Sequence, residues 1–310
     1  MRFTPSAEQR AFTASMHEML RSADTPSVIR AWASGDHEPG LALWRRLAGV
    51  GLHGLLHDAG LPEVVLAFEV LGYHAVPGPL VESVAVLPVL LRDGPPEWLR
   101  GLASGELIGT LAAPPLLPYA LDADAAGLCL HVDGPQLSEF DPGEPLTSVD
   151  PARRLSTVDR LRPLALRADP GAIDHGALAV AAQLLGVGRR LLDDTVAYAK
   201  HRQQYGRPIG QFQAVKHLLA EVVVGLELAR PLVHAAALTE TPRDISAARV
   251  ACADAAYLSA RTALQVHGAV GYTAEHNLGL WFTKVRALRS AWGSQAWHRD
   301  RVLQALVASS

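Results

Sequence analysis

The chain has few cysteines and no excess of positive charge. Its 310 residues include two cysteines, and 28 Lys and Arg against 31 Asp and Glu give a formal net charge of −3. Two cysteines cannot form a disulfide framework, although a single bridge stays open, and they suit a reducing compartment. The near balance of charge leaves no electrostatic footprint for nucleic acid. We therefore expect a cytoplasmic protein that does not bind DNA or RNA.

Long apolar runs and familiar catalytic motifs are also missing. The first ten residues lack the apolar core of a signal peptide, and no segment approaches the roughly 18 uninterrupted apolar residues of a membrane span. A Walker loop, His-Glu-x-x-His and Gly-x-Ser-x-Gly do not occur. His53 and His57 have the i, i+4 spacing of metal ligands, but no acidic or Cys partner has a clear relation to them. We expect no metal site and no association with a membrane.

Helical periodicity dominates the first third of the chain. Apolar residues recur at helical spacing over residues 41–52, 63–73 and 81–91. Breaks rich in Gly and Pro stand at residues 36–40, 77–79 and 94–96. The pattern predicts helices joined by loops, and we assign residues 1–106 to a helical N-terminal domain.

The periodicity changes between residues 107 and 167. Short apolar stretches at 107–111 and 128–132 alternate with breaks such as residues 133–135 and Asp-Pro-Gly-Glu-Pro at 141–145. This pattern favours strands and turns. About 60 residues are few for an independent sandwich or barrel. We therefore expect a reduced middle β segment that packs on its neighbours.

The last part, residues 168–310, has the strongest helical signal. Apolar stripes over residues 178–196 and 215–233 predict two long helices joined around residues 205–208, and further helices are expected from about Arg243 and Glu275. Long helices joined by short loops favour an antiparallel bundle. The whole chain is therefore expected to be mostly α.

Two polar clusters interrupt this helical region, at residues 201–213 and 264–276. In the first, Gly206 and Gly210 permit close backbone approach, and Arg202 offers a planar donor fork suited to phosphate. In the second, Gly268 and Gly271 precede a further helix, whose first backbone amides could face an anion. The alternative is a pair of polar loops with glycine caps.

Together the clusters resemble two elements of the acyl-CoA dehydrogenase family. These are Arg-x-x-[Phe/Tyr]-Gly-x-x-[Ile/Leu]-x-x-x-Gln, here from Arg202, and Gln-x-x-Gly-x-x-Gly-[Tyr/Phe]-x-x-Glu, here from Gln265. The similarity spans residues 177–284, with a weaker echo over residues 68–79. The resemblance implies a helical N-terminal domain, a middle β-domain and a C-terminal four-helix bundle, which is the order that periodicity predicts.

The resemblance also implies a cofactor and a set of contacts. FAD would be held mainly by a neighbouring subunit, with its pyrophosphate and adenosine side against this chain. The residues that match the family's contacts are Arg202, Tyr205 and Gln213, followed by Gln265, Gly268 and Gly271. One flavin shared by two chains implies an oligomer.

Two features of the family's flavin and acyl pocket are missing. The Thr-Glu-Pro-Gly loop should fall in residues 109–115, where only the proline is kept, and the later Trp-x-Thr element has no counterpart. The resemblance therefore implies that this chain does not hold the flavin ring by itself.

The family's catalytic carboxylate is missing as well. Its usual position aligns with Trp292 and its alternative position with Gly176, neither of which can abstract a proton. His175 and Asp174 are weak substitutes, and Glu275 lies in the Gly-Tyr-x-x-Glu part of the motif, where a structural role at a helix start is expected.

These departures predict a short, non-catalytic subunit of a heteromeric, α2β2-type bacterial acyl-CoA dehydrogenase. A longer homologue would supply the base and the flavin-ring pocket, with electron-transfer flavoprotein or a similar acceptor. The similarity to enzymes of steroid breakdown implies α,β-dehydrogenation of a ring-bearing CoA thioester. Two alternatives stay open: a self-sufficient homomeric dehydrogenase with a relocated base, and a flavin-free scaffold homologue.

Overall fold

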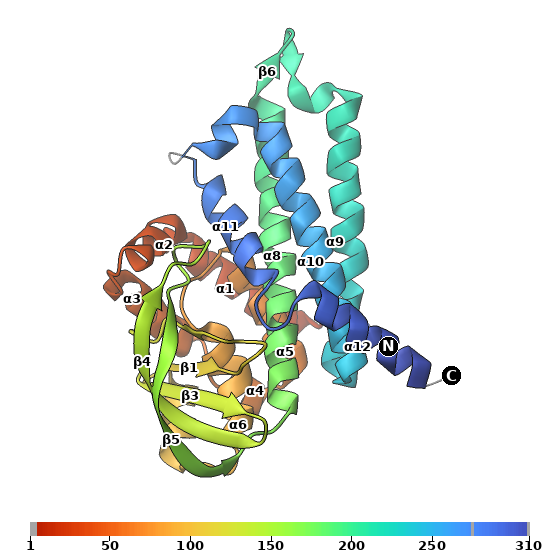
Figure 1. The fold of residues 1–310 in the computed structure, drawn as a ribbon. Helices are drawn as coiled ribbons and strands as arrows, with labels where there is room; N and C mark the ends of the chain where they lie inside the picture. The colour runs from red at the N-terminus through yellow and green to blue at the C-terminus, as the bar shows by residue number, and fades with distance from the viewer. Residues whose placement is uncertain (1–4, 274–275, 309–310) are drawn as a thin grey trace.

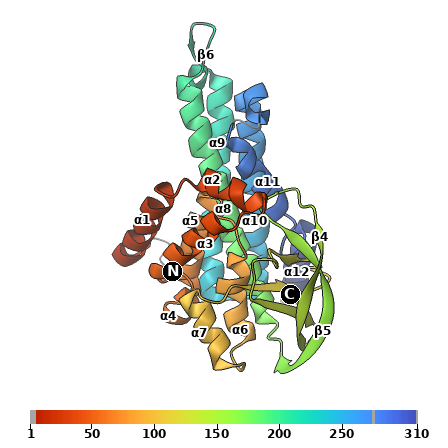
Figure 2. The same cartoon turned by 90° about the vertical axis from the view of Figure 1, so that its left-hand side faces the viewer.

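The computed structural model describes residues 5–273 and 276–308. A layer of helices and a small sheet lie on one side of an elongated helical bundle, and one end of the bundle extends well beyond them (Figure 1). Figure 2 shows the same arrangement from the side, with the sheet and the extended end far apart. The chain is mostly α, as the sequence predicts.

The N-terminal domain consists of short helices around an apolar core. Their bounds are α1 Ala7–Arg21, α2 Thr25–Ala33, α3 Glu38–Gly49, α4 Leu55–Asp58, α5 Leu61–Tyr73, the π-helical segment η1 Val81–Val86, α6 Leu87–Leu90 and α7 Pro96–Ser104. The expected helices are confirmed, but α3 and α7 begin inside stretches that were expected to be loops. Each has a proline in its first turn, where the missing N–H costs no hydrogen bond.

The middle segment forms a five-stranded sheet in the order β1-β3-β4-β5-β2. The strands are β1 Gly109–Ala112, β2 Ala120–Leu121, β3 Leu128–Asp133, β4 Gln136–Leu146 and β5 Leu155–Arg167. The prediction of a break at residues 141–145 is wrong, because these residues lie inside β4. On one side they pair with β5, with shifts in register. On the other side they have no partner strand among the described residues, because the pairing of β4 with β3 reaches only to Glu139 of β4. Prolines are tolerated there because that edge of the strand needs no donors.

The C-terminal helices form the expected bundle. They are α8 Gly171–His201, α9 Gln213–Thr239, α10 Pro242–His267, α11 Leu278–Leu288 and α12 Gln295–Ala308. The predicted domain boundaries after residues 106 and 167 stay predictions, and they fall in the loops that follow α7 and β5.

A close crossing of α5 and α8 joins the N-terminal domain to the bundle. A Cβ on Gly72 would lie 2.1 Å from the carbonyl oxygen of Gln183, and one on Gly186 would lie 1.9 Å from that of Glu69. Only glycine permits such an approach of two helix backbones. The crossing therefore sets the relative position of the two helix backbones.

Candidate functional site

The first polar cluster forms a hairpin at the extended end of the bundle. After α8, strands β6 Gln203–Gln204 and β7 Arg207–Pro208 pair around Tyr205 and Gly206, whose φ values are 53° and 78°. Two positive φ values suit the two-residue turns that match strand twist. A short 3-10 turn, η2 Ile209–Gln211, then leads into α9. The hairpin leaves Tyr205 93% exposed.

The second cluster lies at the same end. Helix α10 ends at His267, and η3 Gly268–Tyr272 follows it. The ring of His267 stacks on Tyr198 in the last turns of α8, with centroids 4.2 Å apart. The structure therefore brings the two motifs together, as Figure 1 shows. We call residues 198–213 and 264–273 the bundle tip.

The polar side chains of the bundle tip are open to solvent. Gln213, Gln265 and Gly268 are exposed, as is Arg202, whereas Gly271 is buried. Across the described part of the chain, the Arg202 guanidinium has no carboxylate partner. The tip points away from the chain's own sheet in both ribbon views (Figures 1 and 2). An anion that binds here is therefore presented to a molecule other than the chain's own β segment.

A second region of interest lies where the N-terminal domain, the β segment and the end of α11 meet. A cavity of about 380 Å³ opens there, and we call it the interdomain cleft; it is lined by residues that include Glu82, Leu117, Tyr119, Arg153 and Ser290. Glu82 is 2% exposed, and its Oε2 atom has no hydrogen-bond partner. Burial raises the pKa of this carboxyl, and the Arg153 charge opposes the shift.

Other charged side chains are buried where the β segment packs on α2 and α11. Lys284 Nζ lies 3.2 Å from Asp150 Oδ2, which ties α11 to the β segment. Asp122 Oδ1 accepts hydrogen bonds from the Trp32 indole at 3.1 Å and from the Arg154 backbone N–H at 3.0 Å. Burial raises the pKa of Asp122 to about 7. Within residues 5–273 and 276–308 no group of three or more His, Cys, Asp or Glu side chains is placed to hold a metal ion.

The two positions that align with the family's catalytic carboxylate are in contact. Trp292 is 1% exposed, and a Cβ on Gly176 would lie 2.3 Å from the Trp292 ring. The indole therefore fills the space beside Gly176. A carboxylate at position 176 would therefore require a change at Trp292.

The candidate bases lie elsewhere or outside the described residues. Asp174 forms a bidentate pair with Arg301, at 2.6 and 3.1 Å, that joins α8 to α12. His175 Nε2 lies 3.7 Å from a Glu240 carboxylate oxygen, and burial lowers the pKa of this imidazole. Neither side chain lines the interdomain cleft. Glu275 lies outside the described residues, and the catalytic roles of all three stay predictions.

Sequence reasoning missed Glu82. It is the single acidic residue of the apolar stretch at residues 81–91, which was interpreted only as a helix. Charged side chains are almost never fully buried without a partner. An isolated acid in a buried helix was therefore the signal that was available.

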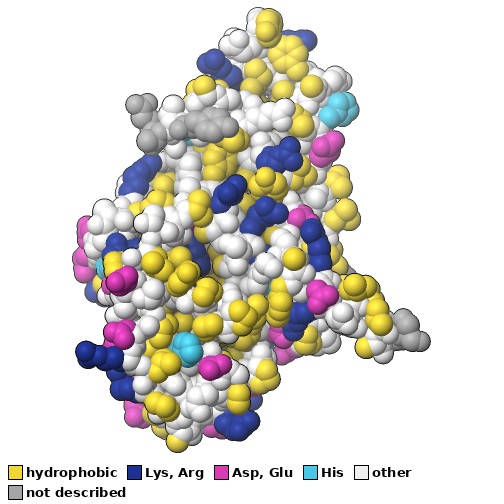
Figure 3. All heavy atoms as spheres, in the orientation of Figure 1, with side chains coloured by type: hydrophobic (Ala, Val, Ile, Leu, Met, Phe, Trp, Pro, Cys, Tyr) yellow, Lys and Arg dark blue, Asp and Glu magenta, His cyan; other side chains and the backbone are white. Residues whose placement is uncertain are grey.

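Two apolar surfaces are exposed on the bundle. Helix α9 packs on its neighbours with one face and exposes Val223, Val224, Leu228, Leu232 and Leu238 on another. By length and composition alone it is the one helix in the described chain that could cross a membrane, and a third of its apolar window is buried. The projecting end of α12 carries exposed Leu303, Leu306 and Val307, and Figure 3 shows apolar side chains along it.

Comparison with known proteins agrees with this architecture. Residues 167–307 match the family model of the acyl-CoA dehydrogenase C-terminal domain. Acyl-CoA dehydrogenase IpdE2 of Mycobacterium tuberculosis is 32% identical over 293 residues, which cover 91% of this chain and 92% of that protein.

Solved structures share the fold over almost the whole chain. The ChsE4-ChsE5 complex from Mycobacterium tuberculosis matches with a TM-score of 0.83 and 24% identity, covering 99% of each chain. The Tcur3481-Tcur3483 steroid ACAD, as a G363A variant, matches with a TM-score of 0.81 and 22% identity, covering 98% of this chain and 99% of that one. The near full-length similarity to IpdE2, together with the two motifs at the bundle tip, shows that the chain belongs to the acyl-CoA dehydrogenase family.

Proposed function

We propose that this chain is the non-catalytic subunit of a heteromeric, FAD-dependent acyl-CoA dehydrogenase. In this proposal it contributes the bundle tip to a flavin that a longer homologous subunit holds. That partner supplies the catalytic base and the pocket for the flavin ring. An α2β2 assembly would then have one complete FAD site for each pair of unlike chains.

The observation that carries the proposal is the direction of the bundle tip. Arg202, Tyr205 and Gln213 are exposed and lie at the end of the bundle remote from the chain's own sheet. A guanidinium without a carboxylate partner is suited to a pyrophosphate. These residues therefore fit the phosphate side of FAD, while their placement favours a cofactor held by another chain.

The two positions at which the sequence analysis looked for the catalytic carboxylate also support the proposal. Trp292 and Gly176 leave no carboxylate at the two aligned positions, and the indole occupies the space between them. The reaction of this family removes a proton from Cα of an acyl thioester, so a base must lie within hydrogen-bond reach of that atom. In this chain the residues at those positions can exclude water but cannot accept the proton.

Exposed apolar faces support an assembly. The outer face of α9 and the end of α12 expose large aliphatic side chains, which a partner chain would remove from water. Two of the structures with the same fold are two-protein complexes by their names, ChsE4-ChsE5 and the steroid ACAD Tcur3481-Tcur3483. This favours a longer homologue as the partner, and helix α9 as an interface rather than a membrane span.

The substrate and acceptor belong to the same proposal. We assign a CoA thioester with a ring-bearing, steroid-derived acyl group as the substrate, supported by the steroid ACAD among the structural relatives. FAD, when bound, accepts the hydride from Cβ. Arg202 and Gln213 would hold its phosphate side, and electron-transfer flavoprotein or a similar protein of the cytoplasm would reoxidise it.

Expression of the chain alone and together with a longer homologue tests the proposal. We expect a colourless chain that does not reduce a dye with an acyl-CoA, and a complex with about one FAD for each pair of chains. Arg202→Ala in the complex should lower the FAD content, whereas Arg45→Ala, an exposed arginine paired with Glu38 on α3, should not. A yellow, active product from the chain alone would contradict the proposal, and unchanged FAD in the Arg202 variant would favour a flavin-free scaffold.

One observation favours the alternative of a self-sufficient enzyme. Glu82 is a carboxyl group in the interdomain cleft, and a base relocated to it would face the cavity. Burial raises the pKa of this carboxyl, which makes its ionised form a stronger base. Loss of dye reduction in a Glu82→Gln variant of the isolated chain would establish the alternative.

A further inference from the structure

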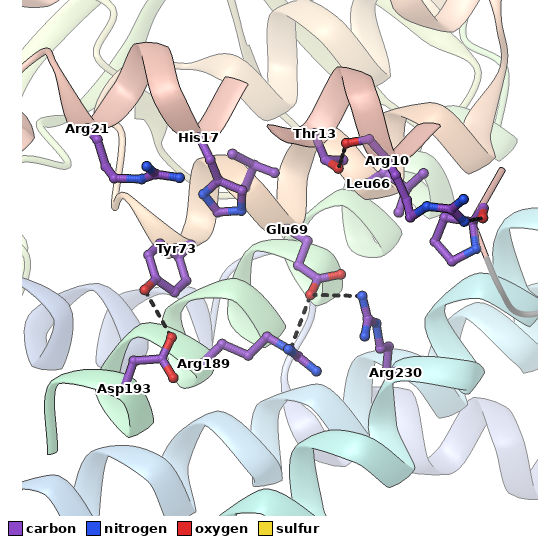
Figure 4. Close-up of a pocket in the computed structure, with 12 residues that line it drawn as sticks. Arg10, Thr13, His17, Arg21, Leu66, Glu69, Tyr73, Arg189, Asp193 and Arg230 are labelled. Atoms are coloured by element: carbon purple, nitrogen blue, oxygen red, sulfur yellow. Dashed lines mark hydrogen bonds and ion pairs between the residues drawn. The ribbon is translucent and has the colours of Figure 1, made fainter. Parts of the chain in front are cut away.

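A groove on the outer side of the molecule gathers arginines from three helices. It lies between α1 and the pair α8 and α9, with α5 as its floor, and has a volume of about 590 Å³ (Figure 4). The four arginines are Arg10 and Arg21 of α1, Arg189 of α8 and Arg230 of α9. We call it the arginine groove. It shares no lining residue with the interdomain cleft or the bundle tip.

The carboxylates of the groove do not balance these charges. Arg189 Nε and Arg230 Nη2 approach the same oxygen, Glu69 Oε1, at 3.3 and 3.9 Å. Asp193 is engaged by the Tyr73 hydroxyl, which donates to it over 3.0 Å. Glu69 is therefore shared by two guanidinium groups, as the dashed lines in Figure 4 show, and Arg189 also pairs through Nη2 with Glu227, which lies outside the lining of the groove.

The two arginines of α1 add positive charge to the groove, and α1 adds no carboxylate that pairs with them. Arg10 donates to the Pro5 carbonyl, and neither Arg10 nor Arg21 forms an ion pair with a carboxylate in the part of the chain that the structure describes. Both are exposed at the rim of the groove. Like charges gathered around one cavity repel each other, and an anion in the cavity would relieve that repulsion.

The chemistry of the lining indicates which anion fits. Guanidinium groups bind phosphate oxygens through two parallel hydrogen bonds, and arginines on opposite walls suit a ligand with more than one phosphate. The rings of His17 and Tyr73 meet edge to face at 5.2 Å beside the arginines, and an aromatic ring face can stack on a planar base. His17 Nδ1 lies 3.0 Å from His74 Nε2, and this contact fixes the imidazole. A groove of this volume is within the usual range for small ligands.

We propose that the arginine groove is a binding site for a phosphate-bearing anion of the nucleoside diphosphate class. The phosphates contact Arg10, Arg21 and the Arg189–Arg230 pair, and the planar base lies against His17 and Tyr73. Glu69 competes with the ligand for Arg189 and Arg230. This site is independent of the FAD half-site, so either proposal can fail without the other.

Titration of the purified full chain with ADP by calorimetry at low salt tests the site. Arg21→Gln should weaken ADP binding about tenfold, since a hydrogen bond to a charged group contributes about that much. Glu69→Gln should tighten binding, because it removes a negative charge beside the ligand and the carboxylate that Arg189 and Arg230 share. Arg45→Gln, an exposed arginine outside the groove, should leave binding unchanged. Urea unfolding of each variant confirms that it is folded.

The bundle tip needs its own control, because it could also bind ADP. Arg202→Gln should leave ADP affinity unchanged if the arginine groove is the site, while loss of affinity in that variant alone would overturn the proposal. Absence of saturable binding of both ADP and inorganic pyrophosphate at low salt would also overturn it. Equal or weaker ADP binding in a folded Glu69→Gln variant would contradict the predicted competition.

Discussion

The bundle tip and the interdomain cleft place their polar groups in opposite environments. At the tip, Arg202 and Tyr205 stand in solvent and make few contacts with the rest of the chain. Behind the lining of the cleft, Asp122, Asp150 and Lys284 are buried, and each is held by a partner from another part of the chain. The tip can therefore bind a ligand without changing the fold, whereas the cleft groups are part of what holds the domains together.

This difference determines how freely the residues of each region can be substituted. An exposed side chain at a hairpin contributes little to the free energy of unfolding. A residue type that suits a ligand can therefore stand there without loss of stability. A buried position is coupled to its neighbours through packing, as Trp292 is to Gly176. Any side chain larger than a hydrogen at position 176 would therefore require a change at Trp292.

The largest effect is expected from removing the buried charge of Asp122, which lies against Trp32 and the Arg154 backbone. The folded pKa of Asp122 is raised to about 7, so between about pH 4 and pH 7 the folded state binds a proton that the unfolded state has lost, and stability falls as pH rises. Asp122→Asn keeps the Oδ1 acceptor and removes the charge. We expect the variant to lose this pH dependence and to be more stable at pH 8 by roughly 4 kcal/mol at most.

Urea unfolding at pH 5 and pH 8 measures this effect. Asp124→Asn is the matched control, because Asp124 lies two residues away and its ion pair with Arg154 is partly exposed. Equal pH slopes for the wild-type chain and Asp122→Asn would refute the prediction.

A smaller effect is expected where the two aligned base positions touch. Gly176→Ala places a methyl group against the Trp292 ring and should lower the free energy of unfolding by about 1–3 kcal/mol. Trp292→Gly removes the ring and suits the φ of 58° at that residue. In that background, Gly176→Ala should cost less than about 0.5 kcal/mol. Strictly additive effects in this double-mutant cycle would show that the two residues are not coupled.

The smallest effect on stability is expected at the bundle tip. Tyr205→Ala removes a side chain that is 93% exposed, so the free energy of unfolding should change by less than about 0.5 kcal/mol. Thermal and urea unfolding of the isolated chain measure it. A decrease in the free energy of unfolding of more than about 1 kcal/mol would mean that Tyr205 stabilises the fold. The contrast between the bundle tip and the buried charges would then be wrong.

Much of the fold could be predicted from local pattern. The stripes over residues 178–196 and 215–233 lie in α8 and α9, and the stretches at 107–111 and 128–132 overlap β1 and β3. The break expected at residues 141–145 was wrong because the tolerance of a strand for proline depends on which neighbour pairs with it. Pairing of that kind joins residues far apart in sequence, so local reasoning has no access to it.

The candidate site divides in the same way. The motifs of the bundle tip are short in sequence, and the sequence alone named Arg202, Tyr205 and Gln213 and indicated the family. Other features depend on segments that are far apart in the sequence and meet only in the folded chain. They are the surroundings of Glu82, the Trp292–Gly176 contact and the arginine groove. The small net charge and the two cysteines gave no indication of nucleic-acid binding or of a disulfide framework, and these are properties that composition alone can report. Which charges are buried, paired or left without a partner was decided by packing, because electrostatic free energy depends on distance and burial.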